Sequence, residues 1–142
     1  MEKKKIWRAG VIPYHIDDNK RVRMLFMKPA THERGGLQFQ IAKGKIEDGE
    51  MPMEAAFREA NEELGLLKSN IMKKSDCGVY LSRTHIYAAR IEDPELFGVP
   101  MESETGDTRW MTINEFRAEG RELHSPIVED VYNMIRSEED VE

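Results

Sequence analysis

The chain has 142 residues, of which 39% are hydrophobic and 34% charged, a composition typical of one globular domain rather than of a disordered chain. No apolar run approaches the ~20 residues that cross a bilayer, the basic start MEKKKIW lacks the apolar core of a secretory signal, and the single Cys77 excludes an internal disulfide; together these features favour a cytoplasmic protein without a membrane partner. The net charge of −6, with no long basic tract, argues against duplex nucleic acid as a partner.

Alternation of apolar residues and the placement of turn formers predict several strands. The first two form a hairpin joined by a turn at residues 17–20, and a polar loop at 28–36 follows. The predicted strands cover residues 6–16, 22–27 and 37–41, a long stretch at 78–91, and a short one at 109–111.

Three segments carry helix signals. Pro52 suits a first helical turn and Gly65 a helix end, so we expect a helix over 52–64 with Met53, Phe57, Ala60 and Leu64 as its core stripe. Thr112 and Glu115 fit a capping box, and Ser125-Pro126 opens a helix through about Ile135. Residues 137–142 are expected to be a frayed tail. This order predicts an α/β fold, a mixed sheet packed against helices, in a single domain covering residues 1–142.

Acidic residues concentrate in one segment. Residues 44–66 hold seven acidic and two basic side chains, nearly all of the excess negative charge. Glu59, Glu62 and Glu63 share one helix face, where three carboxylates repel one another unless a cation neutralises them or they splay into water. Oxygen-only ligands select a hard ion, Mg²⁺ or Mn²⁺; an ordinary solvated acidic face is the alternative. We expect Arg58 to pair with Glu62, or with Glu50 or Glu54.

The loop and helix together are more specific than their charges. Gly44, Glu50, Arg58, Glu59, Glu62, Glu63 and Gly65 have the spacing of a recognisable signature, which Leu66 closes. This segment, 44–66, resembles the signature box of the Nudix hydrolases. Ala60 is small for the aliphatic position of that signature.

The resemblance implies a fold and a reaction. The fold is the Nudix-type α/β/α sandwich, with a mixed β-sheet and the Nudix loop and helix. The reaction is Mg²⁺-dependent hydrolysis of a pyrophosphate bond in a nucleoside diphosphate derivative, with Mn²⁺ as a substitute. Glu59, Glu62 and Glu63 are the implied metal ligands, together with the Gly44 carbonyl, while Arg58 and Glu50 are implied to orient Glu59. Family members are often dimers, and a homodimer is kept open here.

Residues outside the box bear on the substrate. Glu104 precedes Trp110 by six residues, a spacing similar to the distal loop of enzymes that cleave diadenosine polyphosphates; it is a candidate metal ligand and base, beside a glutamate of the box. Lys43 stands before the box glycine, as in those enzymes, although Ala42 replaces their proline. Arg83 and Tyr87 are candidate phosphate and base contacts.

The resemblance therefore favours a dinucleoside polyphosphate such as diadenosine tetraphosphate as the substrate. A nucleoside triphosphate pyrophosphatase and a hydrolase of RNA 5′ ends remain as alternative enzymes. A nucleotide-sensing module without turnover is an alternative of another class.

Overall fold

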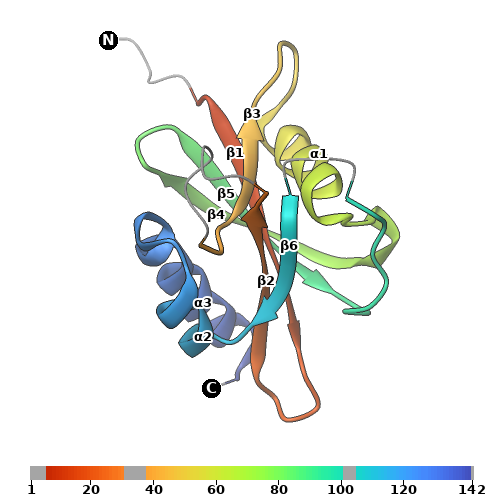
Figure 1. Ribbon diagram of the computed structural model, residues 1–142, viewed down its shortest axis with the longest axis vertical. Helices are drawn as coiled ribbons and strands as arrows, with labels where there is room; N and C mark the ends of the chain where they lie inside the picture. Colours follow the sequence, from red (N-terminus) through yellow and green to blue (C-terminus); the bar gives the residue numbers. More distant parts are fainter. Residues whose placement is uncertain (1–5, 31–37, 101–104, 142) are drawn as a thin grey trace.

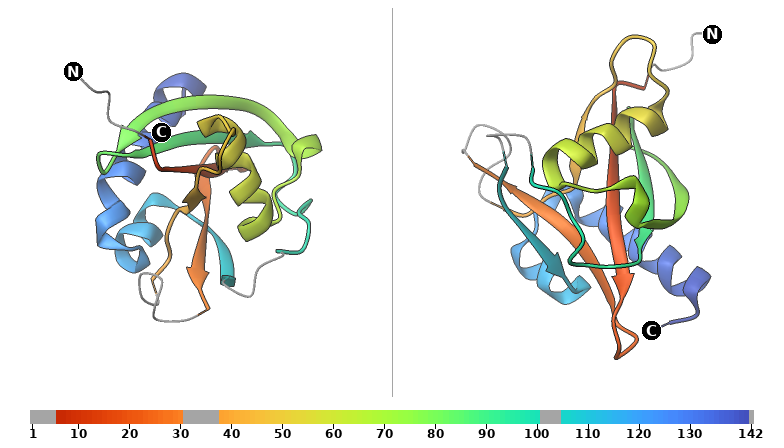
Figure 2. Two further views of the ribbon diagram at one scale, coloured as in Figure 1. Left: turned by 90° about the horizontal axis from the view of Figure 1, so that it is seen from above. Right: turned by 90° about the vertical axis from the view of Figure 1, so that its right-hand side faces the viewer.

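A computed structural model describes residues 6–30, 38–100 and 105–141, and these residues form a six-stranded mixed sheet between helices (Figure 1). Helix α1 covers one face of the sheet, while α2 and α3 cover the other (Figure 2). The strands are β1 (Arg8–Ile16), β2 (Val22–Pro29), β3 (Ala42–Lys45), β4 (Ile71–Tyr80), β5 (Thr84–Ile91) and β6 (Thr105–Met111). The α-helices are α1 (Pro52–Leu64), α2 (Ile113–Glu119) and α3 (Ser125–Glu139). The predicted α/β/α architecture with a mixed sheet is confirmed.

Strand β1 lies at the centre of the sheet and changes partner along one edge. It pairs in parallel with β5 on one side. On the other side, residues 8–11 pair with β3 and residues 14–16 pair with β2, both antiparallel. Pro13, which has no N–H to donate to a ladder, lies at this change of partner. The sheet therefore opens between β2 and β3.

The two faces of β1 belong to two separate apolar cores. Ala9 and Val11 face α1, whereas Ile12 and Tyr14 face α2 and α3, as the period of two in a strand requires. The α1 side is lined by small residues of the helix, and the other side by larger residues from both helices. Both cores are fully shielded, so the sheet is a rigid support for the loops at its edges.

Helix α1 begins at Pro52 and ends at Leu64, as predicted. Gly65 follows with φ +74°, and a Cβ on this residue would lie 1.9 Å from the carbonyl oxygen of Gly98, so only glycine fits here. The predicted core stripe is wrong at Met53, which is 40% exposed. Buried alanines, including Ala60, let the helix approach the sheet closely instead.

Several strand boundaries also differ from the predictions. Strand β3 begins only at Ala42, because Phe39 and Gln40 form isolated bridges. The predicted stretch at 78–91 is divided into β4 and β5 by a turn at residues 81–83, in which Leu81 and Ser82 have positive φ angles. Strand β6 begins at Thr105 rather than at residue 109.

The predicted frayed tail at 137–142 is wrong for its first residues, because α3 continues to Glu139. The Glu139 carboxylate is largely buried and contacts the side chains of Tyr14, Lys73 and Arg90, which come from β1, β4 and β5. These contacts between distant parts of the sequence anchor the last helical turn on the sheet.

Candidate functional site

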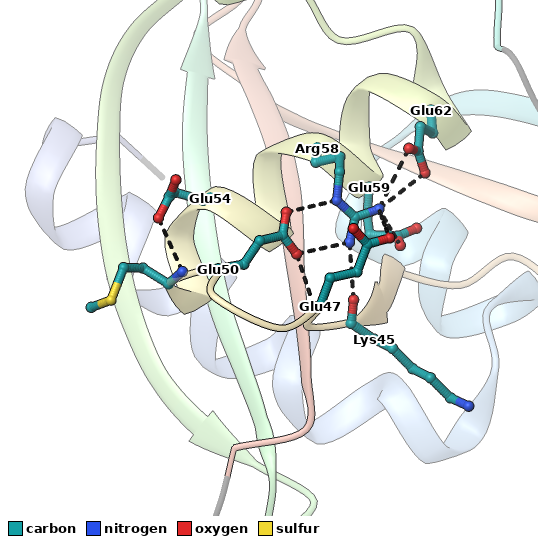
Figure 3. A network of polar contacts seen from close by, with 8 residues as sticks. Lys45, Glu47, Glu50, Glu54, Arg58, Glu59 and Glu62 are labelled. Carbon is teal, nitrogen blue, oxygen red and sulfur yellow. Dashed lines mark hydrogen bonds and ion pairs between the residues drawn. The ribbon is translucent and has the colours of Figure 1, made fainter.

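Arg58 organises the segment 44–66, in which the loop 46–51 leads into α1 (Figure 3). Its Nε and one terminal nitrogen donate to both oxygens of Glu50, at 2.8 and 3.0 Å. The other terminal nitrogen lies 3.0 Å from a Glu59 oxygen and 3.3 Å from Glu62. The guanidinium also donates to the Lys45 carbonyl at 3.0 Å, which ties the helix to β3. A bidentate ion pair of this kind between arginine and a carboxylate fixes the orientation of both side chains.

Two of the three predicted partners of Arg58 are therefore present, Glu50 and Glu62. Glu54 instead accepts a hydrogen bond from the Met51 N–H and caps α1. Glu47 was missed as a neighbour: its carboxylate lies 3.8 Å from Arg58 and its N–H donates to Glu50. The signal for Glu47 is its place in the loop, three residues before Glu50.

The Arg58 contacts change the acidity of the groups involved. Hydrogen bonding from Arg58 and from the backbone of the loop lowers the pKa of Glu50 below its usual value. Hydrogen bonding to Glu50 and Glu59 raises the already high pKa of Arg58. The pair is therefore fully ionised near neutral pH and holds Glu59 from one side.

Glu59 lies directly against the backbone of Gly44. A Cβ on Gly44 would come within 2.2–2.5 Å of the carboxylate carbon and oxygens of Glu59, so any larger residue would displace that carboxylate. The register places Gly44 opposite Ala9 on the α1 face of the sheet. A carboxylate and backbone oxygens here are ligands of the kind that hard divalent cations prefer, so these residues fit such an ion.

The other predicted metal ligands differ in their surroundings. The Glu62 side chain is 28% exposed, whereas Glu63 is buried and its backbone carbonyl accepts a hydrogen bond from Thr105. Glu104 lies outside the described residues. Within residues 6–30, 38–100 and 105–141, no three His, Cys, Asp or Glu side chains form a group that could hold a metal ion. Metal binding by these residues stays a prediction.

The three predicted substrate contacts do not lie together. Lys43 is on β3, on the face that α2 and α3 cover, and burial is the main reason why its pKa is lowered. Tyr87 lies on the opposite face, beside α1, stacked on His85 at 4.5 Å. Arg83 is in the turn before β5, with its guanidinium over the Trp7 ring. Lys43 and Tyr87 are therefore separated by the sheet.

Comparison with known proteins identifies the family. The NUDIX domain family matches residues 6–131, so the chain belongs to this family. Members of this family generally use divalent metal ions. A CMP-5′-(N-acetyl-N-hydroxy-3-aminopropyl)phosphonate hydrolase from Streptomyces rubellomurinus is 31% identical over 104 residues, which are 70% of this chain and 48% of that protein. The chain thus spans about half the length of the curated relative it matches.

Solved structures share the fold at low sequence identity. An Ap4A hydrolase from C. elegans has a TM-score of 0.72 at 13% identity, with 93% of this chain and 98% of that chain covered. RenU, a Nudix hydrolase from M. smegmatis, has a TM-score of 0.72 at 17% identity, covering 92% and 88%. The NUDIX domain of Shewanella oneidensis NrtR, complexed with ADP ribose, has a TM-score of 0.69 at 12% identity, covering 94% and 90%.

The length and hydropathy of a helix decide whether it could cross a membrane. Among the described residues, no helix is both long and apolar enough to cross a membrane.

Proposed function

We propose that this protein is a Mg²⁺-dependent Nudix pyrophosphohydrolase. One observation carries the proposal: the Glu59 carboxylate is packed on Gly44 and held by Arg58, which Glu50 holds in turn. Because Gly44 has no side chain, the Glu59 carboxylate lies close to the backbone of β3, where a backbone carbonyl and the carboxylate could share one cation.

The residues of the chain have separate tasks in this reaction. Glu59, Glu62 and Glu63, with the Gly44 carbonyl, would hold the metal, and Glu104 is a candidate fourth carboxylate. A bound Mg²⁺ supplies polarisation of the phosphoryl oxygens and a lower pKa for the attacking water. Arg58 and Glu50 orient Glu59, while a box glutamate or Glu104 takes the proton of the water that attacks phosphorus. The pyrophosphate bond breaks, and one phosphoryl group keeps the oxygen of the water.

A dinucleoside polyphosphate such as diadenosine tetraphosphate is the substrate that we propose first. Lys43 supports it, since a half-buried ammonium group beside the box suits a phosphate chain. Arg83 and Tyr87 are still proposed as contacts to phosphate and base, but Tyr87 lies on the opposite face of the sheet from Lys43, so these two residues do not contact the same group of the substrate. Nucleoside triphosphates and RNA 5′ ends are the alternatives. The Streptomyces relative, named for a CMP-linked phosphonate, adds a nucleoside monophosphate joined to a phosphonate as a second candidate class.

The test is product identification by anion-exchange chromatography with wild type and Glu62→Gln. A panel of diadenosine tetraphosphate, nucleoside triphosphates, ADP-ribose, a CMP-linked phosphonate and a 5′-triphosphorylated RNA covers these classes. Glu62→Gln should lose at least ~10²-fold in turnover, because it removes a group that stabilises the transition state. Glu92→Gln, an exposed acid after β5, is the matched control.

The outcomes separate the classes. Formation of ATP and AMP from diadenosine tetraphosphate would support a dinucleoside polyphosphate as the substrate. Formation of a nucleoside monophosphate and pyrophosphate from one nucleoside triphosphate would instead make that triphosphate the substrate. Near-normal turnover by Glu62→Gln would overturn the metal assignment. Nucleotide binding without any product would favour a nucleotide-sensing module.

A cytoplasmic location and a homodimeric state are further parts of the proposal. Cell fractionation tests the location. Size-exclusion chromatography with light scattering tests the dimer, and a monomeric mass would remove it.

A further inference from the structure

A groove runs along the outer side of α1, between this helix and the beginning of β4. Its volume is about 600 Å³, a size that suits a small organic ligand. Its apolar lining comes from the helix, from the segment after it and from β4: Met53, Phe57, Leu66, Leu67 and Ile71. Within the described residues, none of the three predicted metal-binding glutamates of α1 lines it, so the groove is separate from the predicted metal site.

Side-chain hydrogen bonds fix the far end of this groove. The Asn61 side chain donates to the Leu66 carbonyl at 2.9 Å and holds the segment after α1 against the helix. Asn70 is fully buried and donates to the carbonyls of Asp93 and Leu96, both at 2.8 Å, which anchors the residues that lead into β4. The walls are therefore formed before any ligand arrives, so a ligand needs to order little of the protein on binding.

The acidic side chains that line the groove are already engaged (Figure 3). Glu50 accepts two hydrogen bonds from Arg58, so these two charges neutralise each other. Glu54 accepts a hydrogen bond from the Met51 N–H in the first turn of α1, where the N–H groups of the helix favour a negative charge. The acids therefore leave no strong attraction for a positively charged ligand.

Two ammonium groups in the lining have no such compensation. Lys68 and Lys74 line the groove, and within the described parts of the chain neither forms an ion pair with a carboxylate. The Lys74 ammonium lies 4.6 Å from the centre of the Phe57 ring, so it reaches from β4 toward the helix, over the apolar lining. The groove thus combines an apolar surface with uncompensated positive charge, which is complementary to an anion that has an apolar body.

We propose that this groove is a binding site for a small organic anion with an apolar body, a medium-chain carboxylate. The carboxylate pairs with Lys68 and Lys74, and the chain covers the apolar lining. Met53, which is exposed, is shielded from water by the ligand, and its flexible thioether adapts to the shape of the chain. Glu50 and Arg58 also line the groove, so the ligand lies beside the ion pair that holds Glu59. The site goes beyond the proposed function and does not depend on it.

The test is a calorimetric titration of the wild-type protein with straight-chain carboxylates. Decanoate should bind, whereas acetate, which has the charge without the chain, should not. From hexanoate to decanoate the affinity should rise about two- to fourfold per added methylene, because each methylene is removed from water. Decanol, which has the chain without the charge, should bind more weakly than decanoate. Affinity that does not depend on chain length, or equal affinity for decanol and decanoate, would overturn the proposal.

Charge-removing variants test where the carboxylate lies. Lys68→Gln and Lys74→Gln should each weaken decanoate binding about two- to fivefold, the range of an ion pair open to solvent, and should leave decanol binding unchanged. Lys73→Gln is the matched control, because it removes the same charge from β4 while Lys73 pairs with Glu138 and Glu139 of α3, on the opposite face. Decanoate affinities that are equal in the wild type and all three variants would overturn the placement of the anion.

Methyl NMR of protein labelled at its methionine methyl groups locates the ligand without any substitution. Decanoate should shift the methyl resonance of Met53, whereas that of Met24, fully buried in the core on the other face of the sheet, should stay in place. An unchanged Met53 resonance at saturating decanoate would overturn the site. A Met53 resonance that shifts with protein concentration alone would assign the groove to a second copy of this chain and would also overturn the proposal. None of these results depends on whether the protein hydrolyses a nucleotide.

Discussion

Replacing Arg58 with methionine tests how much the box depends on its central guanidinium. The Arg58 side chain is 25% exposed and bonds to Glu50, Glu59 and the Lys45 carbonyl. Breaking a buried pair costs about 3–5 kcal/mol and an exposed one is worth about 0.2–1 kcal/mol, so this network lies between them. We expect Arg58→Met to lower the free energy of unfolding by about 2–3 kcal/mol, roughly 7–10 °C in Tm for a chain of this length.

The pH dependence makes this prediction specific. Glu50 has a lower pKa in the folded state than its ordinary value of 4.5, so its pairing stabilises the fold above that pH. This contribution is lost as the pH falls through the folded-state pKa, because protonated Glu50 no longer attracts Arg58. The difference in Tm between wild type and Arg58→Met should therefore shrink below about pH 4.5.

Thermal melts followed by circular dichroism provide the measurement. Arg58→Lys keeps the positive charge but loses the planar guanidinium that bonds to both oxygens of Glu50. Its Tm should therefore lie between the Tm values of wild type and Arg58→Met. Arg136→Met, at an exposed arginine on α3, should change stability by no more than about 0.5 kcal/mol. The reasoning would be refuted by equal Tm values for Arg58→Met and Arg136→Met, or by a Tm difference that is as large at pH 3 as at pH 7.

Other parts of the fold give predictions of the same kind. Gly65→Ala should destabilise the protein by about 2–4 kcal/mol in urea melts, because it combines a positive φ with a clash against Gly98; an unchanged midpoint would contradict this. Glu139→Gln should lower the free energy of unfolding by about 1–3 kcal/mol and increase amide hydrogen exchange in the last turn of α3, since it weakens charge-assisted hydrogen bonds. Unchanged exchange would show that Glu139 does not hold this turn on the sheet. His124 stays neutral in the fold while the unfolded chain takes up a proton, so stability should fall as the pH drops from about 6.5 to about 3. His124→Gln should flatten that slope, and an identical slope would show that other groups cause it.

Local signals were sufficient to predict the helix that carries the box. Pro52 and Gly65 act through backbone geometry within one turn, and both ends of α1 are where they were predicted. The capping box of Thr112 and Glu115 is also present and starts α2. Such features depend on neighbours in the sequence alone, which is why a single sequence shows them.

Features set by distant contacts were missed. Strand β4 is an edge strand with mostly exposed or half-buried side chains, so it lacks the apolar alternation that marks a strand, and its first residues were not predicted. The end of α3 depends on contacts between Glu139 and three strands, of which the sequence gives no local sign.

The candidate site also combines a feature that the sequence predicted with features that depend on distant contacts. The spacing of the box predicted that Arg58 would meet Glu50, and the structure has this pair. The same pattern could not predict that Lys43 and Tyr87 lie on opposite faces of the sheet, because that depends on strand register. The hydrogen bond from the Ile41 N–H to His124 likewise joins residues that lie far apart in the sequence, so no local pattern predicts it.

The contact between Glu139 and Tyr14 joins positions 125 residues apart, which has a consequence for folding during synthesis. The ribosome makes the strands of the sheet before α3, so Ile12, Tyr14 and Ile86 emerge without the helix that covers them. A chain stalled before α3 therefore exposes the part of this apolar face that α3 covers, a surface that chaperones bind and that promotes aggregation. Release of the last helical turn from the exit tunnel, rather than completion of the box, is the event that closes this fold.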